Sequence, residues 1–490
     1  MKSAVPLAIA LLASQTSSTD LLSPEKIEAE INTINLQRNL WNLNHIANGN
    51  GGNRAFGLPG YKASSDYILE RVQERFANEF DTSLQYFNHT FEQTRNISVT
   101  GPDGEDVLVK TLLYNSPTPL PGGITAQLID TPVDDSRGSA CFEDQWTGIN
   151  ASGKLALVKR GTCAIADKLK LAKGHGALGV ILWNNIAGEP ASATLSAANI
   201  GLLVPVGVIQ QDVGQVWSAR LSAGEELVVN LLVDAIFEQR ESWNIITETK
   251  AGDPNNVVFL GAHLDSVQAG PGINDDGSGT SALLEIASAF RHYKNIPNKV
   301  RFAWWGAEES GLIGSLHYTS SLTEVEADKI RFYLNYDMIG SPFPIYTIYK
   351  NDGQGGDVGA QALLDYLVAA GKPAYYGSFG SSSDYVGFLQ LGIPASGIFT
   401  GAGAPADFCY HLSCDTTANI NEESLTINAK AAGVVAAKLA LSLDGVPPRN
   451  KTSVNPRSRM QIRAMLTMWN VVTEDAAHAH SCSHKSQNIV

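Results

Sequence analysis

The chain has 490 residues, of which 44% are hydrophobic and 17% are charged, and its formal net charge at pH 7 is -14. This length exceeds that of one ordinary domain, and the composition is that of folded, soluble proteins and excludes extensive disorder. The acidic balance argues against nucleic acid as a partner, because nucleic-acid binding needs a basic surface. It equally disfavours docking on anionic lipid.

The first residues have the pattern of a secretory signal peptide. Lys2 precedes an apolar stretch from Ala4 to Ala13, and small polar residues follow that stretch. We therefore assign residues 1–18 to a signal peptide and expect secretion, with the vacuole as an alternative destination. A buried N-terminal helix is the competing interpretation, which Pro6 and the short length disfavour. No stable membrane anchor is expected, because no later segment shows the run of about 20 apolar residues that a membrane span requires.

Four N-glycosylation sequons agree with export, and they lie at Asn88, Asn96, Asn150 and Asn450. Their number matters less than their agreement with the signal, since such triplets also arise by chance.

The chain contains five cysteines. In an oxidising compartment the economical pairings by sequence position are Cys409–Cys414 and Cys141–Cys163. Cys482 is then left over in a polar tail, where it is free, paired between chains or removed by processing.

The first part of the chain predicts helices followed by strands. Ile27, Ile31 and Ile34 recur at helical spacing within residues 24–47. A glycine-rich loop at residues 48–61 ends this pattern. A second helix is expected over about 64–80 and strands over about 82–114. We assign residues 19–121 to the N-terminal part of a catalytic domain.

The character of the sequence changes near residue 117. Short apolar runs alternate with turn signals from 122 to 235, which predicts an inserted, β-rich domain. From 236 to 445 apolar strands alternate with amphipathic helices, which predicts an α/β domain with a mixed, mostly parallel sheet covered by helices on both faces. Residues 446–490 lack a clear core pattern, and we expect a disordered tail.

The segment VVFLGAHLDS ends a buried strand with His263 and Asp265. Open α/β sheets place their sites at this carboxyl edge, and a ligating imidazole needs an acceptor for its second N–H. A histidine bonded to backbone is an equally good interpretation of this motif alone. The following loop, GINDDGSG, returns Asp275 to the same edge. A helix N-cap is the alternative there, whereas a calcium loop is disfavoured because no Glu follows at the required offset.

Two further apolar strands end in acids. One terminates in Glu308-Glu309, whose adjacent carboxylates would repel each other and lose solvation unless a cation compensates them. One of the two can bind metal while its neighbour acts as a general base, although a solvated loop tip is the alternative. The other strand ends in Asp337. His411 lies inside the ring that a Cys409–Cys414 disulfide would close, which would hold the imidazole in place.

These motifs together supply the candidate ligands His263, Asp275, Glu309, Asp337 and His411. Two imidazoles and three carboxylates suit zinc, but they are too many for one tetrahedral catalytic site that keeps an open position. They fit two zinc ions about 3.5–4 Å apart with one bridging carboxylate. The residues therefore predict a two-metal hydrolase.

With these motifs in this order, the chain resembles the zinc aminopeptidases of peptidase family M28, in particular the fungal secreted leucine aminopeptidases and the aminopeptidase Y type. The resemblance covers about 30–445 and rests on GGNRAFGLPGY, HLDS, GINDDGSG, AEESGLIGS, NYDMIG and YHLSCDT. It implies a zinc-exopeptidase fold and identifies the insertion at 122–235 as a protease-associated domain. It also implies a monomer that removes N-terminal, Leu-like residues from peptides with a free N-terminus.

The resemblance also implies a role for each site residue. His263 and Asp337 would hold one Zn²⁺, Glu309 and His411 the second, and Asp275 would bridge the two ions. Glu308 would be the general base, Asp265 would orient His263, and Tyr410 would stabilise the oxyanion. The Asp275–Asp276 peptide bond would be cis.

Two features depart from the family pattern. Relatives commonly show Gly-Arg-Ser-Asp-Tyr where this chain has GSSSDY at 380–385, so Ser382 replaces the arginine. The segment before Tyr410 is also shorter than in many relatives. The alternative functions are a carboxypeptidase, which would need a cation for a terminal carboxylate, a glutaminyl cyclase, which uses fewer metals, and a non-catalytic peptide-binding protein, which would have lost ligands.

Overall fold

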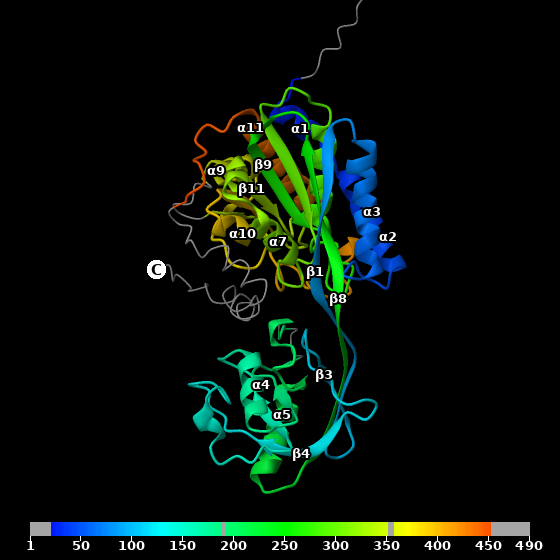
Figure 1. Cartoon of the computed structure of the whole chain (residues 1–490), viewed down its shortest axis with the longest axis vertical. Coiled ribbons are helices and arrows are strands. Elements are labelled where there is room, and N and C mark those ends of the chain that lie inside the picture. Colours follow the sequence, from blue (N-terminus) through cyan, green and yellow to red (C-terminus); the bar gives the residue numbers. More distant parts are fainter. Residues whose placement is uncertain (1–20, 189, 191–192, 196, 351–356, 452–490) are drawn as a thin grey trace, which may run out of the picture.

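Two long antiparallel strands join the two lobes of the molecule (Figure 1). These are β1 (Phe80–Thr100) and β8 (Val228–Thr249), which pair from Phe80↔Thr249 to Thr100↔Asn230. The computed structural model describes residues 21–188, 190, 193–195, 197–350 and 357–451. The predicted signal peptide and most of the predicted tail, including Cys482, lie outside the described residues.

The described strands form one sheet of 14 strands, ordered β13-β12-β14-β11-β9-β10-β8-β4-β5-β6-β7-β3, with β1 pairing beside β8. The larger lobe contributes β9 (Asp253–His263), β10 (Asn298–Trp305), β11 (Ile330–Tyr336), β12 (Thr347–Tyr349), β13 (Tyr375–Gly377) and β14 (Ala395–Phe399). Strand β9 is parallel to both β10 and β11, and β11 is parallel to β14. Because β12 is antiparallel to β14, the sheet is mixed and mostly parallel in this lobe.

Helices cover both faces of this part of the sheet, which confirms the predicted fold class. Along β9, Val258 and Leu260 belong to one core cluster, and Val257 and Phe259 belong to another. The first cluster is covered by α1 (Pro24–Glu30), α2 (Thr33–Gly49), α3 (Pro59–Leu69), α6 (Gly277–Phe290), α9 (Asp357–Ala369) and α11 (Glu422–Leu441). The second is covered by α7 (Ile313–Ser321), α8 (Glu324–Lys329) and α10 (Tyr385–Gln390).

The N-terminal helical stretch is two helices rather than the single one predicted over 24–47. The chain is extended at Asn32, whose side chain accepts a hydrogen bond from the backbone N–H of Asn35 and so caps α2. The predicted helix over 64–80 begins earlier, as α3, and continues as the π-helical turn η1 (Glu70–Arg75). Short 3-10 turns span Glu143–Trp146, Ala197–Asn199 and Thr417–Asn419.

Helix α11 has the length and composition of a membrane span, contrary to the expectation that no later segment does. However, 72% of its apolar window is buried inside the protein. It packs in the first core cluster, which is how an apolar helix is used in the core of a large domain.

The smaller lobe is built on four parallel strands, β4 (Ile124–Asp130), β5 (Leu155–Lys159), β6 (Gly179–Trp183) and β7 (Val206–Ile209), with helices α4 (Ile165–Gly174) and α5 (Gln211–Ser222). The short strands β2 (Asp106–Val107) and β3 (Val109–Lys110) precede them, and β3 pairs with β7. The pairing of this lobe therefore begins before residue 122, where the sequence predicted the insertion to start.

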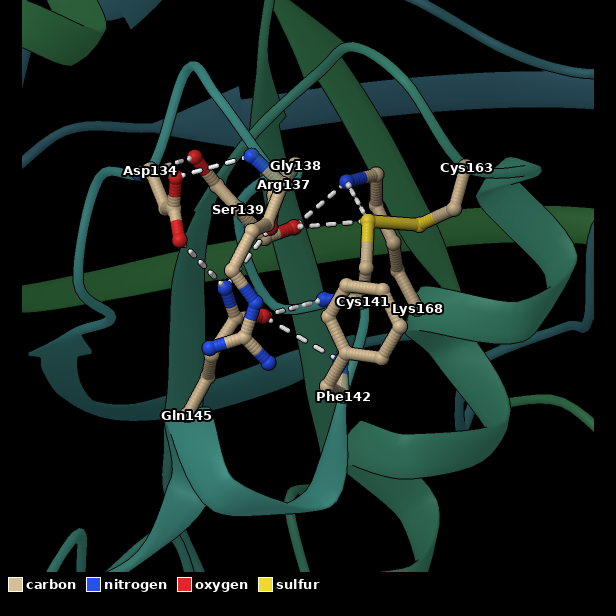
Figure 2. Close-up of a disulfide and its surroundings, with 9 residues drawn as sticks. All are labelled: Asp134, Arg137, Gly138, Ser139, Cys141, Phe142, Gln145, Cys163 and Lys168. Atoms are coloured by element: carbon tan, nitrogen blue, oxygen red, sulfur yellow. Dashed lines mark hydrogen bonds between the residues drawn. A yellow bond between two sulfur atoms is a disulfide. The ribbon is translucent and has the colours of Figure 1, made fainter.

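A disulfide links Cys141 to Cys163 in this lobe (Figure 2). The buried ammonium group of Lys168 donates to the carbonyl of Ser139 and lies 3.3 Å from Cys141 Sγ. Gln145 accepts from the backbone N–H of Cys141 at 2.7 Å, so the segment before the disulfide is held by side chains as well as by the S–S bond.

The start of the predicted C-terminal tail is packed rather than disordered. Val446 is buried, and Arg449 is only 5% exposed. The guanidinium of Arg449 donates to Asp328 and to the carbonyl of Leu391, both at 3.0 Å. The sequence did not indicate this because one arginine among polar residues carries no core pattern.

Candidate metal centre

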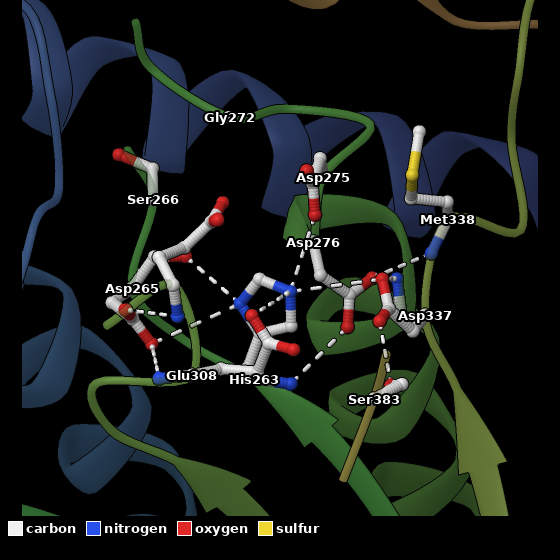
Figure 3. A network of polar contacts seen from close by, with 12 residues as sticks. His263, Asp265, Ser266, Gly272, Asp275, Asp276, Glu308, Asp337, Met338 and Ser383 are labelled. Carbon is white, nitrogen blue, oxygen red and sulfur yellow. Dashed lines mark hydrogen bonds and ion pairs between the residues drawn. The ribbon is translucent and has the colours of Figure 1, made fainter. Parts of the chain in front are cut away.

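Three of the five candidate ligands meet because each lies at the end of a neighbouring strand. His263 ends β9, Glu308 and Glu309 follow β10, and Asp337 follows β11. These strands are parallel neighbours, so their carboxyl ends lie at one edge of the sheet. Asp275 comes from the loop before α6 (Figure 3).

Asp275 lies between the two imidazoles. Its Oδ1 is 3.2 Å from His263 Nε2, and its Oδ2 is 3.2 Å from His411 Nε2. Asp337 Oδ1 is 3.6 Å from His263 Nε2, and Glu309 Oε2 is 3.0 Å from His411 Nε2. The five residues thus form two groups of donor atoms that share one carboxylate.

These donor atoms fit metal ions. Ligands at 2.0–2.1 Å from a tetrahedral zinc ion are about 3.3 Å apart, since this is the edge of the tetrahedron. The separations of 3.0, 3.2 and 3.6 Å agree with that edge. In addition, Glu309 Oε1 and Asp337 Oδ1 are buried and have no hydrogen-bond partner among the described residues. Buried carboxylate oxygens normally find a partner, so these two point to an ion.

The electrostatics of the site favour positive charge. Burial alone would lower the pKa of both histidines, but neighbouring carboxylates outweigh it. The pKa of His263 lies well above its usual value, and that of His411 is raised to about 10. Burial raises the pKa of Glu308 well above its usual value, and nearby Asp384, Glu309 and Asp337 add to the rise. Such crowding of buried carboxylates is relieved by a bound cation.

Asp265 contacts His263 through its backbone carbonyl and two further site residues through its carboxylate. His263 Nδ1 lies 3.1 Å from the backbone carbonyl oxygen of Asp265 and 3.8 Å from its carboxylate. A proton on Nδ1 leaves Nε2 free to face the other ligands. The Asp265 carboxylate instead accepts the backbone N–H groups of Glu308 at 3.0 Å and Glu309 at 3.2 Å (Figure 3).

The backbone has a left-handed conformation beside several site residues. Ala307, Met338 and His411 have φ angles of 56°, 55° and 58°. Left-handed residues other than glycine cost roughly 1 kcal/mol each, and such strain is concentrated at functional sites. The Asp275–Asp276 peptide bond is cis, as the resemblance implied.

The loop that carries His411 is tied down on both sides. The structure contains the Cys409–Cys414 disulfide, and the Tyr410 ring stacks on the His411 ring with centroids 3.8 Å apart. Asp415 accepts the backbone N–H of Asp275 at 3.1 Å, so the loop is also bonded to the ligand that lies between the imidazoles.

A buried chain of hydrogen bonds behind Asp337 was not recognised in the sequence. Ser383 donates to Asp337 Oδ2 at 2.7 Å and accepts from Asn335 Nδ2 at 2.8 Å (Figure 3). Asn335 in turn accepts from the Tyr333 hydroxyl at 3.0 Å, which accepts from Trp305 Nε1 at 3.0 Å. The available signal was the presence of polar groups within β11, a strand that is otherwise apolar and buried.

Arg54 is a second residue whose position the sequence did not reveal, although it lies in the GGNRAFGLPGY loop. Its side chain is fully buried. It donates to the carbonyls of Pro271 at 2.8 Å, Gly272 at 2.6 Å and Leu264. These carbonyls belong to the segment between His263 and Asp275, so the guanidinium holds the metal-binding loop closed.

Comparison with known proteins places the chain in a family. Residues 244–436 match peptidase family M28, and residues 124–217 match the PA domain. The chain is 38% identical to an aminopeptidase of Pseudomonas aeruginosa over 466 residues, which cover 87% of this chain and 83% of that protein. It is 36% identical to leucine aminopeptidase 2 of Trichophyton rubrum, with 83% of this chain and 84% of that protein covered.

The chain belongs to peptidase family M28. Solved structures agree with this result. The aminopeptidase from Aneurinibacillus sp. strain AM-1 has a TM-score of 0.71 at 27% identity, covering 87% of this chain and 99% of that one. A zinc aminopeptidase from Bacillus subtilis has a TM-score of 0.65 at 25% identity, covering 85% of this chain and 95% of that one. The predicted family is therefore confirmed. Membership of M28 implies zinc as the metal. The relatives also support aminopeptidase activity for this chain.

Proposed function

We propose that this protein is a secreted aminopeptidase that uses two Zn²⁺ ions to remove apolar N-terminal residues from peptides. The observation that carries the proposal is the placement of Asp275, whose two oxygens face the imidazoles of His263 and His411 at equal distances of 3.2 Å. A carboxylate in this position is the bridging ligand of a two-metal site. His263 with Asp337 and His411 with Glu309 complete the two proposed zinc sites.

Zinc bound here would supply a water of lowered pKa and would polarise the scissile carbonyl. Glu308 is the proposed general base: it takes a proton from the attacking water and gives it to the leaving amine. Asp265 fixes the backbone of Glu308 and thereby aims its carboxylate. Tyr410 is the proposed donor to the oxyanion.

The charges of the site explain the preference for a free N-terminus. Glu308 and Asp337 are buried carboxylates that would attract the substrate's α-ammonium group. A carboxypeptidase would instead need a cation to hold a terminal carboxylate. Arg54 lies near Asp265 and Asp276, but it is fully buried and donates to backbone carbonyls.

An apolar patch beside the ligand loops supports a preference for Leu-like residues. Phe343 and Phe408 are each 62% exposed, and their rings meet edge to face with centroids 6.1 Å apart. Phe343 follows the Asp337 strand end, and Phe408 precedes His411. We assign the first side chain of the substrate to this exposed aromatic pair.

Secretion is proposed from the signal pattern and from two further features. Two disulfides suit an oxidising compartment. Of the proposed glycosylation sites, Asn88, Asn96 and Asn150 are exposed and Asn450 is half-buried. The metal centre is built from one chain, so we propose that a monomer is sufficient for activity. The proposed destination is the medium, with the vacuole as the alternative.

The proposal is tested with Glu308→Gln. This variant should lower kcat for a leucine arylamide by about 10²–10⁴-fold, because it removes the general base. Its zinc content, measured by mass spectrometry, should stay at the wild-type value, and an arylamide blocked at its N-terminus should not be cleaved by either protein. An active variant that carries its full zinc would contradict the assignment of Glu308, and cleavage of the blocked substrate would contradict an aminopeptidase.

A further inference from the structure

A pocket adjoins the metal centre on the side of β10 and β1. It is lined by the apolar side chains of Phe56, Phe91 and Val267 and by the polar side chains of Glu92, Gln268 and Glu309. The pocket therefore connects strand β1, which leads to the smaller lobe, with the carboxylates of the metal centre.

Glu92 is a buried carboxylate that the proposed mechanism does not use. It is 6% exposed, and its Oε2 is buried without a hydrogen-bond partner among the described residues. Burial raises its pKa to about 7, although a hydrogen bond from the backbone of Tyr114 opposes the rise. A carboxylate in such surroundings is costly unless a partner compensates it. Gln268 donates to the Glu92 carbonyl at 2.6 Å, which ties this part of β1 to the loop that follows the metal-binding strand β9.

The order of strands places this pocket opposite the apolar patch of Phe343 and Phe408. In the sheet, β11 and β14 lie on one side of β9, whereas β10, β8 and β1 lie on the other. Phe343 follows β11 and Phe408 follows β14, whereas Glu92 lies on β1 and Glu309 follows β10. A peptide whose first side chain rests on the apolar patch and whose chain crosses this edge of the sheet would extend towards Glu309, one of the residues that line the pocket.

We propose that this pocket binds the side chain of the second residue of the substrate, and that Glu92 selects a cationic side chain there. The inference rests on the proposed aminopeptidase function. A lysine matches the pocket, because its apolar stem can lie along Phe56, Phe91 and Val267 while its ammonium group reaches Glu92. A charge-assisted hydrogen bond to a buried carboxylate is worth more than one made in water.

The test compares two peptide amides that begin with leucine and have lysine or norleucine in second place. The two side chains differ by the terminal ammonium group. The wild-type protein should show kcat/KM about tenfold higher for the lysine peptide, as a hydrogen bond to a charged group predicts. In Glu92→Gln the ratio should fall to about one. Zinc content and circular dichroism check that this variant is folded.

Glu241→Gln is the matched control, because Glu241 is an exposed carboxylate on the neighbouring strand β8. Above pH 7, where Glu92 is mostly ionised, the two substitutions make nearly the same change in net charge. In assays at such a pH this control therefore accounts for the general attraction of cations to an acidic protein. Its ratio should stay at the wild-type value.

Equal rates for the two peptides with the wild-type protein would overturn the proposal, as would an unchanged ratio in folded Glu92→Gln. A second pair, with lysine or norleucine in first place and leucine in second, tests the opposite orientation. If Glu92→Gln changes only this second ratio, the pocket holds the first residue and our assignment is wrong. If the wild-type protein releases no amino acid from any of these peptides, the aminopeptidase proposal itself fails.

Discussion

Replacement of Glu92 by glutamine should stabilise the protein at neutral and alkaline pH but not in acid. The pKa of Glu92 is about 7 in the folded protein, because the carboxyl group is buried, compared with an ordinary value of 4.5. A raised pKa means that the folded state favours the protonated carboxyl. The contribution of the Glu92 carboxyl group to the free energy of unfolding is therefore fully present below pH 4.5, and it is lost as the pH rises towards 7.

The size of the effect follows from the two pKa values. Each pKa unit corresponds to 1.36 kcal/mol, so a rise from 4.5 to about 7 corresponds to about 3 kcal/mol above pH 7. Glutamine has nearly the same shape and does not titrate, so it avoids this loss. The difference in free energy of unfolding between variant and wild type should grow between pH 4.5 and 7 and then stay constant.

Equilibrium unfolding in urea at pH 5, 6, 7 and 8 measures this difference, with both proteins saturated with zinc. Other titrating groups are common to the two proteins and cancel in the comparison. Glu241→Gln, which changes an exposed carboxylate, should show no pH-dependent difference from wild type. If Glu92→Gln has the same stability as wild type at pH 8, or is less stable there, the reasoning from burial is wrong. A gain in stability would agree with a carboxylate that is kept for binding rather than for folding.

Three other substitutions test the support of the metal centre. Ser383→Ala removes the hydroxyl that donates to Asp337, so zinc affinity should fall roughly 10–100-fold. Competition with a chelator measures this affinity. Ser382 is exposed, and Ser382→Ala should leave the zinc affinity unchanged. Arg54→Met leaves buried carbonyls without donors and should lower the free energy of unfolding by about 3–5 kcal/mol. Arg54→Lys should recover part of this loss. A Met variant as stable as the wild type would contradict a structural role for the guanidinium. Asp265→Asn keeps one acceptor oxygen but places an amide donor against one of the two backbone N–H groups of Glu308 and Glu309. We expect kcat to fall at least about tenfold, with a smaller change in KM.

The sequence alone indicated the family and the edge of the sheet at which the candidate site lies. His263, Glu309 and Asp337 each lie at the end of an apolar strand, and the carboxyl ends of neighbouring parallel strands must meet at one edge of the sheet. Strand ends, turn residues and cysteine spacing are local signals, so His263, Glu309 and Asp337 could be proposed as metal ligands before any fold was known. The helix break at Asn32 and the packed Arg449 were missed, because a capping side chain and a single buried arginine leave little trace in an apolar pattern.

Only the tertiary structure decided how the site is supported and where the Glu92 pocket lies. That Asp265 uses its backbone carbonyl for His263 and its carboxylate for two amides depends on the path of two loops, not on the identity of the residue. Glu92 and Gln268 are brought together by the register of β1 along β8 and by the loop after β9. Contacts between segments so far apart in the chain arise from packing of the whole sheet, and no local pattern of residues encodes them.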